Sequence, residues 1–70
     1  MYVFWPNDEE VKESELTTAQ WNTIDRLYKK HKLPDNVIIS PSFGGINDKC
    51  VMLDAWGLII GIEQDGYAHT

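Results

Sequence analysis

Two short apolar runs, 50–53 and 58–62, are separated by the link Asp54-Ala55-Trp56-Gly57. Strand-length apolar runs joined by a short glycine-containing link are typical of a β-hairpin, and we expect one over 49–63. The link places Trp56 at or beside the turn, where little of the chain is available to cover a large aromatic side chain. We therefore predict that Trp56 either folds back over its own hairpin or anchors a binding partner.

The clearest helical signal begins at Thr17. Thr17 and Gln20 fit a capping box, in which the threonine hydroxyl accepts from the Gln20 amide and the glutamine side chain accepts from the Thr17 amide. An apolar stripe at three- and four-residue spacing follows it, consisting of Trp21, Ile24, Leu27, Tyr28 and His31. The sequence Leu33-Pro34 ends the element, because the residue before a proline avoids the α region. We predict a helix over about 17–32.

The remaining β-favouring segments complete an α+β fold. A short strand is expected at 2–5, near a sheet edge, and another at 37–40 before the hairpin. The predicted order is β-α-β-β-β, a single small domain over 1–70 with its helix packed on an antiparallel sheet. Residues 67–70 form either a tail or a short extra pairing. The second sheet face carries Met52 and Ile59, and is therefore more apolar than a solvent-facing sheet surface usually is. We expect a covering segment or a homo-oligomer interface there.

Size and charge restrict the classes of function. The chain has 70 residues with 11 acidic and six basic side chains, a net charge of −5. A core of this size typically supplies only ~3–5 kcal/mol, so a partner or self-association would be a natural supplement. The acidic balance argues against direct nucleic-acid binding, which depends on Lys and Arg. It suits a protein partner with a basic surface.

The cysteine count and the lack of a membrane-spanning or signal segment in the sequence indicate the cellular compartment and the redox chemistry. Cys50 is the only cysteine, so an intrachain disulfide is excluded. No apolar run approaches the ~20 residues of a membrane span, and the N-terminus lacks the pattern of a signal peptide. We expect a cytoplasmic protein without a membrane partner, encoded as a complete small open reading frame.

The acidic connector, 8–15, contains five acids, one base and one apolar residue. We expect an exposed arm or a loose turn of helix. One interpretation is a solvated connector whose charges favour the oncoming helix N-terminus. The other is a negative surface that engages Lys or Arg on a partner. With the hairpin, it supplies the predicted partner-binding residues, Asp8, Glu9, Glu10, Glu13, Asp54 and Trp56.

Signals for small-ligand or metal chemistry are weaker. The loop residues that could cradle an anion with exposed amides are Ser40, Ser42, Phe43, Gly44 and Gly45. This segment lacks the lysine and following helix of a phosphate-binding loop, and an ordinary turn explains its glycines. Neither His31 nor His69 has a second metal ligand at useful spacing, and Cys50 alone completes no site. We therefore predict no metal, no cofactor and no catalytic residue.

The leading hypothesis is a non-enzymatic protein–protein interaction or inhibitor protein. In size, acidity and lack of catalytic motifs, the chain resembles the small inhibitors that phages and mobile elements deploy against host defence, a likeness of type that rests on no motif. It implies action in the host cytoplasm on a defence or nucleic-acid-binding protein. Two alternatives remain open: a small-ligand or nucleotide-binding homo-oligomer with its site between subunits near Ser40–Gly45, and a structural subunit of a larger assembly.

Overall fold

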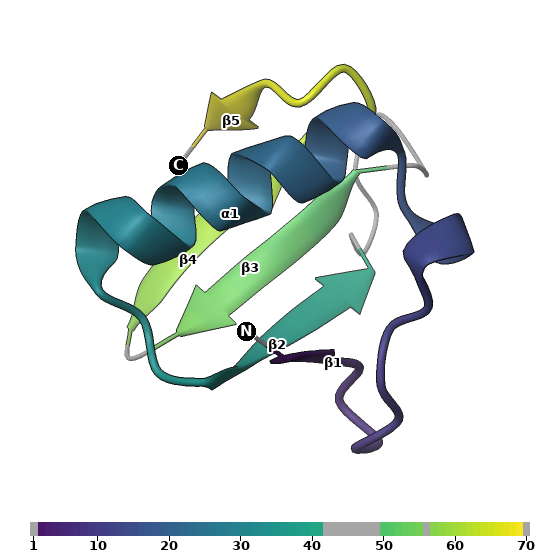
Figure 1. Ribbon diagram of the computed structural model, residues 1–70, viewed down its shortest axis with the longest axis vertical. Helices are drawn as coiled ribbons and strands as arrows, with labels where there is room; N and C mark the ends of the chain where they lie inside the picture. The colour runs from purple at the N-terminus through teal and green to yellow at the C-terminus, as the bar shows by residue number, and fades with distance from the viewer. Residues whose placement is uncertain (1, 42–49, 56, 70) are drawn as a thin grey trace.

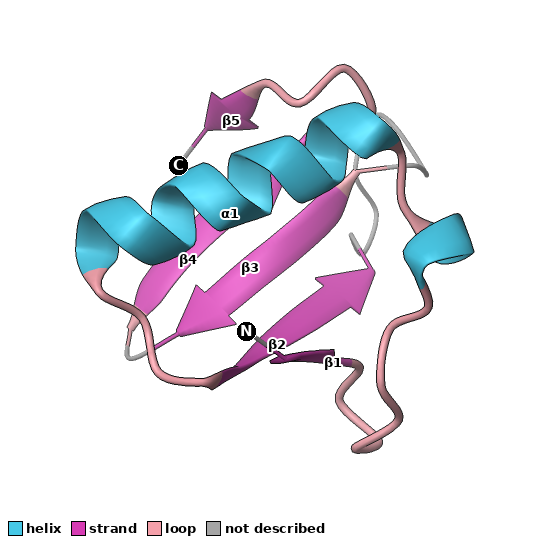
Figure 2. Ribbon diagram, viewed as in Figure 1, coloured by secondary structure: helices cyan, strands magenta, loops and turns pink. Residues whose placement is uncertain are grey.

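The computed structural model describes residues 2–41, 50–55 and 57–69, and these form one helix packed on one face of a five-stranded sheet (Figures 1 and 2). The strands lie in chain order, β1-β2-β3-β4-β5. Their bounds are Tyr2–Phe4 (β1), Asn36–Pro41 (β2), Val51–Ala55 (β3), Leu58–Ile62 (β4) and Ala68–His69 (β5). Helix α1 spans Thr18–His31, and a 3₁₀ turn, η1, spans Glu13–Glu15. The predicted α+β class is confirmed.

The sheet is mixed. β2–β3, β3–β4 and β4–β5 pair antiparallel, as the sequence predicted for the sheet, but β1 and β2 pair parallel. The parallel pair arises because α1 carries the chain from one end of β1 back to the start of its neighbour, which a tight hairpin cannot do. The short extra pairing left open for the C-terminus is β5, at the edge opposite β1.

Helix α1 is bounded as its sequence predicts. The Gln20 amide donates to the Thr17 hydroxyl oxygen over 3.1 Å, and the Thr17 amide donates to the Gln20 side-chain oxygen over 2.9 Å. Lys32 ends the helix in the left-handed region, at φ 50°. The capping box therefore begins the helix where predicted, and the expected span of about 17–32 matches the helix with its two cap residues.

The core lies between α1 and the sheet. Alternate strand residues point toward the helix, and Ile39, Leu53 and Ile62 are fully buried there against Ile24 of α1. Trp21 and Tyr28 are half-buried beside this core. The last residue of the predicted stripe, His31, is exposed, because the helix ends there.

The acidic connector folds back along the free edge of β1. The Trp5 amide donates to the Glu9 carbonyl and the Val11 amide donates to the Val3 carbonyl, over 2.8 and 2.9 Å. The acids are exposed, as expected, and η1 is the loose helical turn. The segment is not exposed throughout, because Val11 is only 6% exposed and joins the core. Pairing the connector to β1 also satisfies backbone groups that an edge strand leaves open.

The loop between β4 and β5 is fastened to the first turns of α1. The Thr17 hydroxyl donates to the Gln64 carbonyl, and the Thr23 hydroxyl donates to the Gly66 carbonyl, each over 2.6 Å. Gly66 adopts φ +87°, the left-handed conformation that commonly ends a three-residue hairpin loop. These contacts fix the direction in which the chain enters β5 and therefore the position of His69.

Candidate functional site

The sheet face that points away from α1, here called the outer face, carries a continuous row of side chains. Strand register places the members of the row opposite one another, from the connector across four strands. Because directly paired residues point to the same side of a sheet, the row reads Glu10, Phe4, Ile38, Asp54 and Ile59. Glu10 thus lies at one end of the row, and Asp54 lies between two isoleucines.

Four of the five side chains of this row are exposed to solvent, and Phe4 is half-buried. Ile38 is 45% exposed and Ile59 is 54% exposed, and Asp54 between them is also exposed. Tyr2, next to the row on β1, is 58% exposed and its ring lies 6.5 Å from that of Phe4. Large apolar side chains in a contiguous exposed group are characteristic of interaction surfaces. The apolar second face predicted from the sequence is therefore present in the structure.

The structure brings together only part of the predicted partner-binding set. Asp54 and Glu10 lie on the outer-face row. Asp8 lies in the turn after β1, at φ 68°, and Glu13 begins η1. Glu9 is exposed beside the β1 edge. These three acids therefore lie outside the row, Asp8 and Glu9 beside β1 and Glu13 in η1, where its carbonyl accepts from Trp21 Nε1.

Several predicted site residues lie outside the described part of the chain. They are Trp56, Ser42, Phe43, Gly44 and Gly45. The turn-anchor role of Trp56 and the anion-loop hypothesis stay predictions for that reason. Ser40, the one described member of the loop set, is half-buried on β2 and pairs with Met52.

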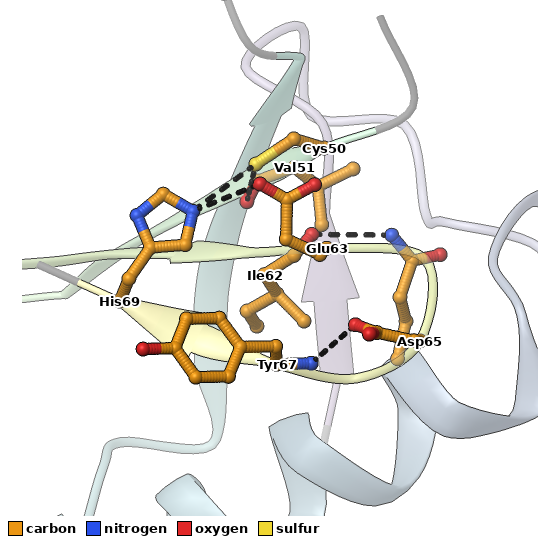
Figure 3. Close-up of polar contacts among 8 residues, drawn as sticks. Cys50, Val51, Ile62, Glu63, Asp65, Tyr67 and His69 are labelled. Carbon is orange, nitrogen blue, oxygen red and sulfur yellow. Dashed lines mark hydrogen bonds and ion pairs between the residues drawn. The ribbon is translucent and has the colours of Figure 1, made fainter. Parts of the chain in front are cut away.

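A second group of functional side chains lies at one corner of the outer face: Cys50, Glu63 and His69 (Figure 3). The His69 Nε2 lies 3.1 Å from Glu63 Oε1 and 4.0 Å from Cys50 Sγ. The β3–β4 register, extended by one residue beyond Val51 and Ile62, places Cys50 opposite Glu63. We expected no ligand cluster, because these residues show no local spacing signal; the sheet register alone brings them together.

The His69 ring is held in position from two sides. Gly61 is its cross-strand partner, and a Cβ at Gly61 would come within 2.8 Å of the imidazole, so only glycine leaves room for the ring. The Tyr67 ring stacks on the imidazole, with centroids 6.0 Å apart and planes 21° apart. A glycine inside a strand often marks a bulge or a close approach by another group, and the group that approaches Gly61 is the His69 ring.

Cys50 is a buried thiol. Its burial is the main cause that raises its pKa, and the negative charge of Glu63 raises it further, while a backbone hydrogen bond from Ile62 lowers it. The sulfur is therefore a protonated thiol near neutral pH in the metal-free protein. Moreover, Cys50 and Glu63 both approach the same nitrogen of His69, whereas a nucleophile–base–acid relay uses the two opposite ring nitrogens. This geometry does not support a cysteine nucleophile.

Comparisons with protein-family models, with curated proteins and with solved structures found no match for this chain. Within the described ranges, no helix has the length and apolar content needed to cross a membrane. We therefore infer function from the outer-face row and from the cluster of Cys50, Glu63 and His69.

Proposed function

We propose that this protein is a non-enzymatic interaction protein that binds a partner protein through the outer face of its sheet and acts by inhibiting or sequestering it. The observation that carries the proposal is the uncovered row in which Asp54 lies between Ile38 and Ile59. Because the other face of the sheet packs against α1, the strands hold the backbone of these residues in place, which lowers the cost of ordering them on binding.

The chemistry of the row favours a partner with an apolar contact surface and a central Lys or Arg. Asp54 supplies a carboxylate at the centre and Glu10 supplies another at the end of the row. The net charge of −5 would speed encounter with a basic surface. Basic surfaces are typical of nucleic-acid-binding proteins, and such a protein, in a host targeted by a phage or mobile element, is the partner class we propose.

The same charges disfavour a second copy of this chain as the occupant. A two-fold symmetric dimer places the same patch on both subunits. Pairing the outer faces about the centre of the row would place Asp54 opposite Asp54 of the second copy, and like charges facing each other across an interface cost several kcal/mol. We therefore expect the isolated protein to be a monomer by light scattering.

The test is affinity capture with single substitutions in the row. Asp54→Lys reverses the central charge, and Ile59→Thr removes apolar surface while keeping a β-branched side chain that suits a strand. Asp25→Lys is the matched control, because Asp25 is equally acidic and exposed but lies on α1. We expect at least about tenfold lower partner recovery for both row variants, the range of an interface hot spot, and unchanged recovery for Asp25→Lys.

Two outcomes would contradict this assignment. Full recovery of partner by both Asp54→Lys and Ile59→Thr would exclude the outer face as the contact. Equal losses for Asp54→Lys and Asp25→Lys, with full recovery for Ile59→Thr, would show only a non-specific charge effect. Trp56→Ala and a connector with its acids replaced by amides, measured in the same capture, test the two remaining predicted contributors separately.

A further inference from the structure

We propose that Cys50, Glu63 and His69 form a binding site for a divalent metal ion of the zinc class. Three different donor atoms, a sulfur, a carboxylate oxygen and an imidazole nitrogen, all lie within 4.8 Å of one another (Figure 3). Cys50 immediately precedes β3, Glu63 immediately follows β4, and His69 lies in β5. This proposal is independent of the partner-binding function.

The distances between the donor atoms are close to those around a tetrahedral ion. Zinc bonds of about 2.3 Å to sulfur and about 2.0 Å to nitrogen or oxygen separate sulfur from nitrogen by about 3.5 Å, and nitrogen from oxygen by about 3.3 Å, at tetrahedral angles. The observed separations are 4.0 Å for Cys50 Sγ to His69 Nε2 and 3.1 Å for His69 Nε2 to Glu63 Oε1. A shift of the thiol by about 0.5 Å would bring the sulfur–nitrogen separation to the tetrahedral value, and the sulfur lies within 4.8 Å of the Glu63 carboxylate oxygen.

The imidazole is already oriented for this role. The bare backbone of Gly61 lies against one side of the His69 ring, and Tyr67 stacks on it. The loop that precedes β5 is tied to α1 by the hydroxyls of Thr17 and Thr23. A ligand held by packing in this way loses little freedom when a metal binds, which is how supporting contacts raise metal affinity.

The donor set selects zinc over the alkaline-earth ions. Mg²⁺ and Ca²⁺ take oxygen ligands, whereas a thiolate with an imidazole suits Zn²⁺ and its neighbours. Binding requires that the Cys50 thiol release its proton to solvent and that His69 carry its single proton on Nδ1, which leaves the Nε2 lone pair for the metal. Three donors leave one tetrahedral position for water or another donor, the arrangement typical of an open zinc site.

The competing explanation is an ordinary Glu63–His69 ion pair beside a buried thiol, and it predicts no metal binding. A titration of untagged, reduced, metal-free protein with Co²⁺ distinguishes the metal site from the ion pair, because Co²⁺ absorbs strongly in the near ultraviolet when a thiolate binds it. Zn²⁺ affinity is then measured by competition with a chromophoric chelator. We expect one ion per chain and a cobalt–thiolate band that Zn²⁺ removes.

The variants assign the ligands. Cys50→Ser should abolish the cobalt–thiolate band, and His69→Gln should weaken Zn²⁺ binding at least about tenfold, since loss of even a supporting contact costs 10–100-fold. Gly61→Ala should weaken binding without removing a donor, because it displaces the imidazole. His31→Gln is the control: His31 is the other histidine, exposed at the end of α1, and its loss should leave the affinity unchanged.

Two results would overturn the proposal. The first is the absence of saturable Co²⁺ or Zn²⁺ binding by reduced wild-type protein whose native circular dichroism is intact. The second is binding that survives in both Cys50→Ser and His69→Gln. His69 lies exposed on the two-residue edge strand β5, so His69→Gln is expected to fold and keeps the test decisive.

Discussion

The close packing of the β4–β5 loop against α1 can be measured with two alanine substitutions. Gly57 and Gly66 both adopt positive φ, +82° and +87°. A Cβ at Gly57 would meet no atom of the described residues within 4 Å apart from its chain neighbours, whereas a Cβ at Gly66 would lie 2.9 Å from the Ala19 carbonyl oxygen and 3.0 Å from the Thr23 hydroxyl oxygen. The two glycines therefore share the same backbone strain on substitution but differ in steric overlap.

The magnitudes follow from that difference. A left-handed conformation costs a non-glycine residue roughly 1–2 kcal/mol, partly offset by about 0.4–1 kcal/mol from the stiffer unfolded chain. Gly57→Ala should therefore destabilise by about 1 kcal/mol. Gly66→Ala adds an overlap with helix backbone, which cannot move aside as a flexible side chain can, and overpacking of this kind costs about 1–3 kcal/mol. We expect a total of about 3 kcal/mol for Gly66→Ala.

The assay is urea and thermal unfolding followed by far-ultraviolet circular dichroism. At about 4–8 °C per kcal/mol for a domain of this size, Gly66→Ala should melt at least about 8 °C below Gly57→Ala. Because a core this small supplies only ~3–5 kcal/mol, complete unfolding of Gly66→Ala also agrees with the reasoning. Equal destabilisation by the two substitutions would refute the claim that the loop is packed against α1.

Three further predictions concern the helix cap, a surface ion pair and the cysteine. Thr17→Ala removes the helix cap and the hydrogen bond to Gln64, and should lower the free energy of unfolding in urea by about 1–2 kcal/mol. An equal decrease for the exposed neighbour Thr18→Ala would contradict the role of the cap. Lys29→Ala breaks only an exposed i,i+4 ion pair with Asp25, separated by 3.1 Å, and should change the free energy of unfolding by no more than about 0.5 kcal/mol. A larger decrease would show that this ion pair contributes more to stability than an exposed pair does. Cys50 is buried and its pKa is raised, so iodoacetamide should label it slowly in the native protein and rapidly in urea; equal rates would show that the thiol is accessible.

The two proposed sites share the outer face of the sheet. The row ends at Ile59 on β4, and His69 packs over Gly61, two residues further along the same strand. A bound divalent ion would add positive charge to an otherwise acidic face. Partner capture in the presence and absence of Zn²⁺ would therefore report whether the two sites influence each other.

Local sequence determined the elements of this protein. The capping box, the apolar stripe and Leu33-Pro34 set the helix, because each acts within a few residues along the chain. The apolar runs around the Gly57 link likewise specified the β3–β4 pairing, and alternation along those strands predicted a second face richer in apolar side chains than solvent normally meets.

Tertiary structure decided what those elements bring together. The parallel β1–β2 pair depends on where α1 returns the chain, and the burial of Val11 depends on the connector folding along β1. Cys50, Glu63 and His69 are separated by 13 and six residues, with no periodicity that relates them. The strand register, together with the space left by the missing side chain at Gly61, brings their donor atoms within 4.8 Å of one another. Register is set by long-range pairing, which no local sequence pattern specifies.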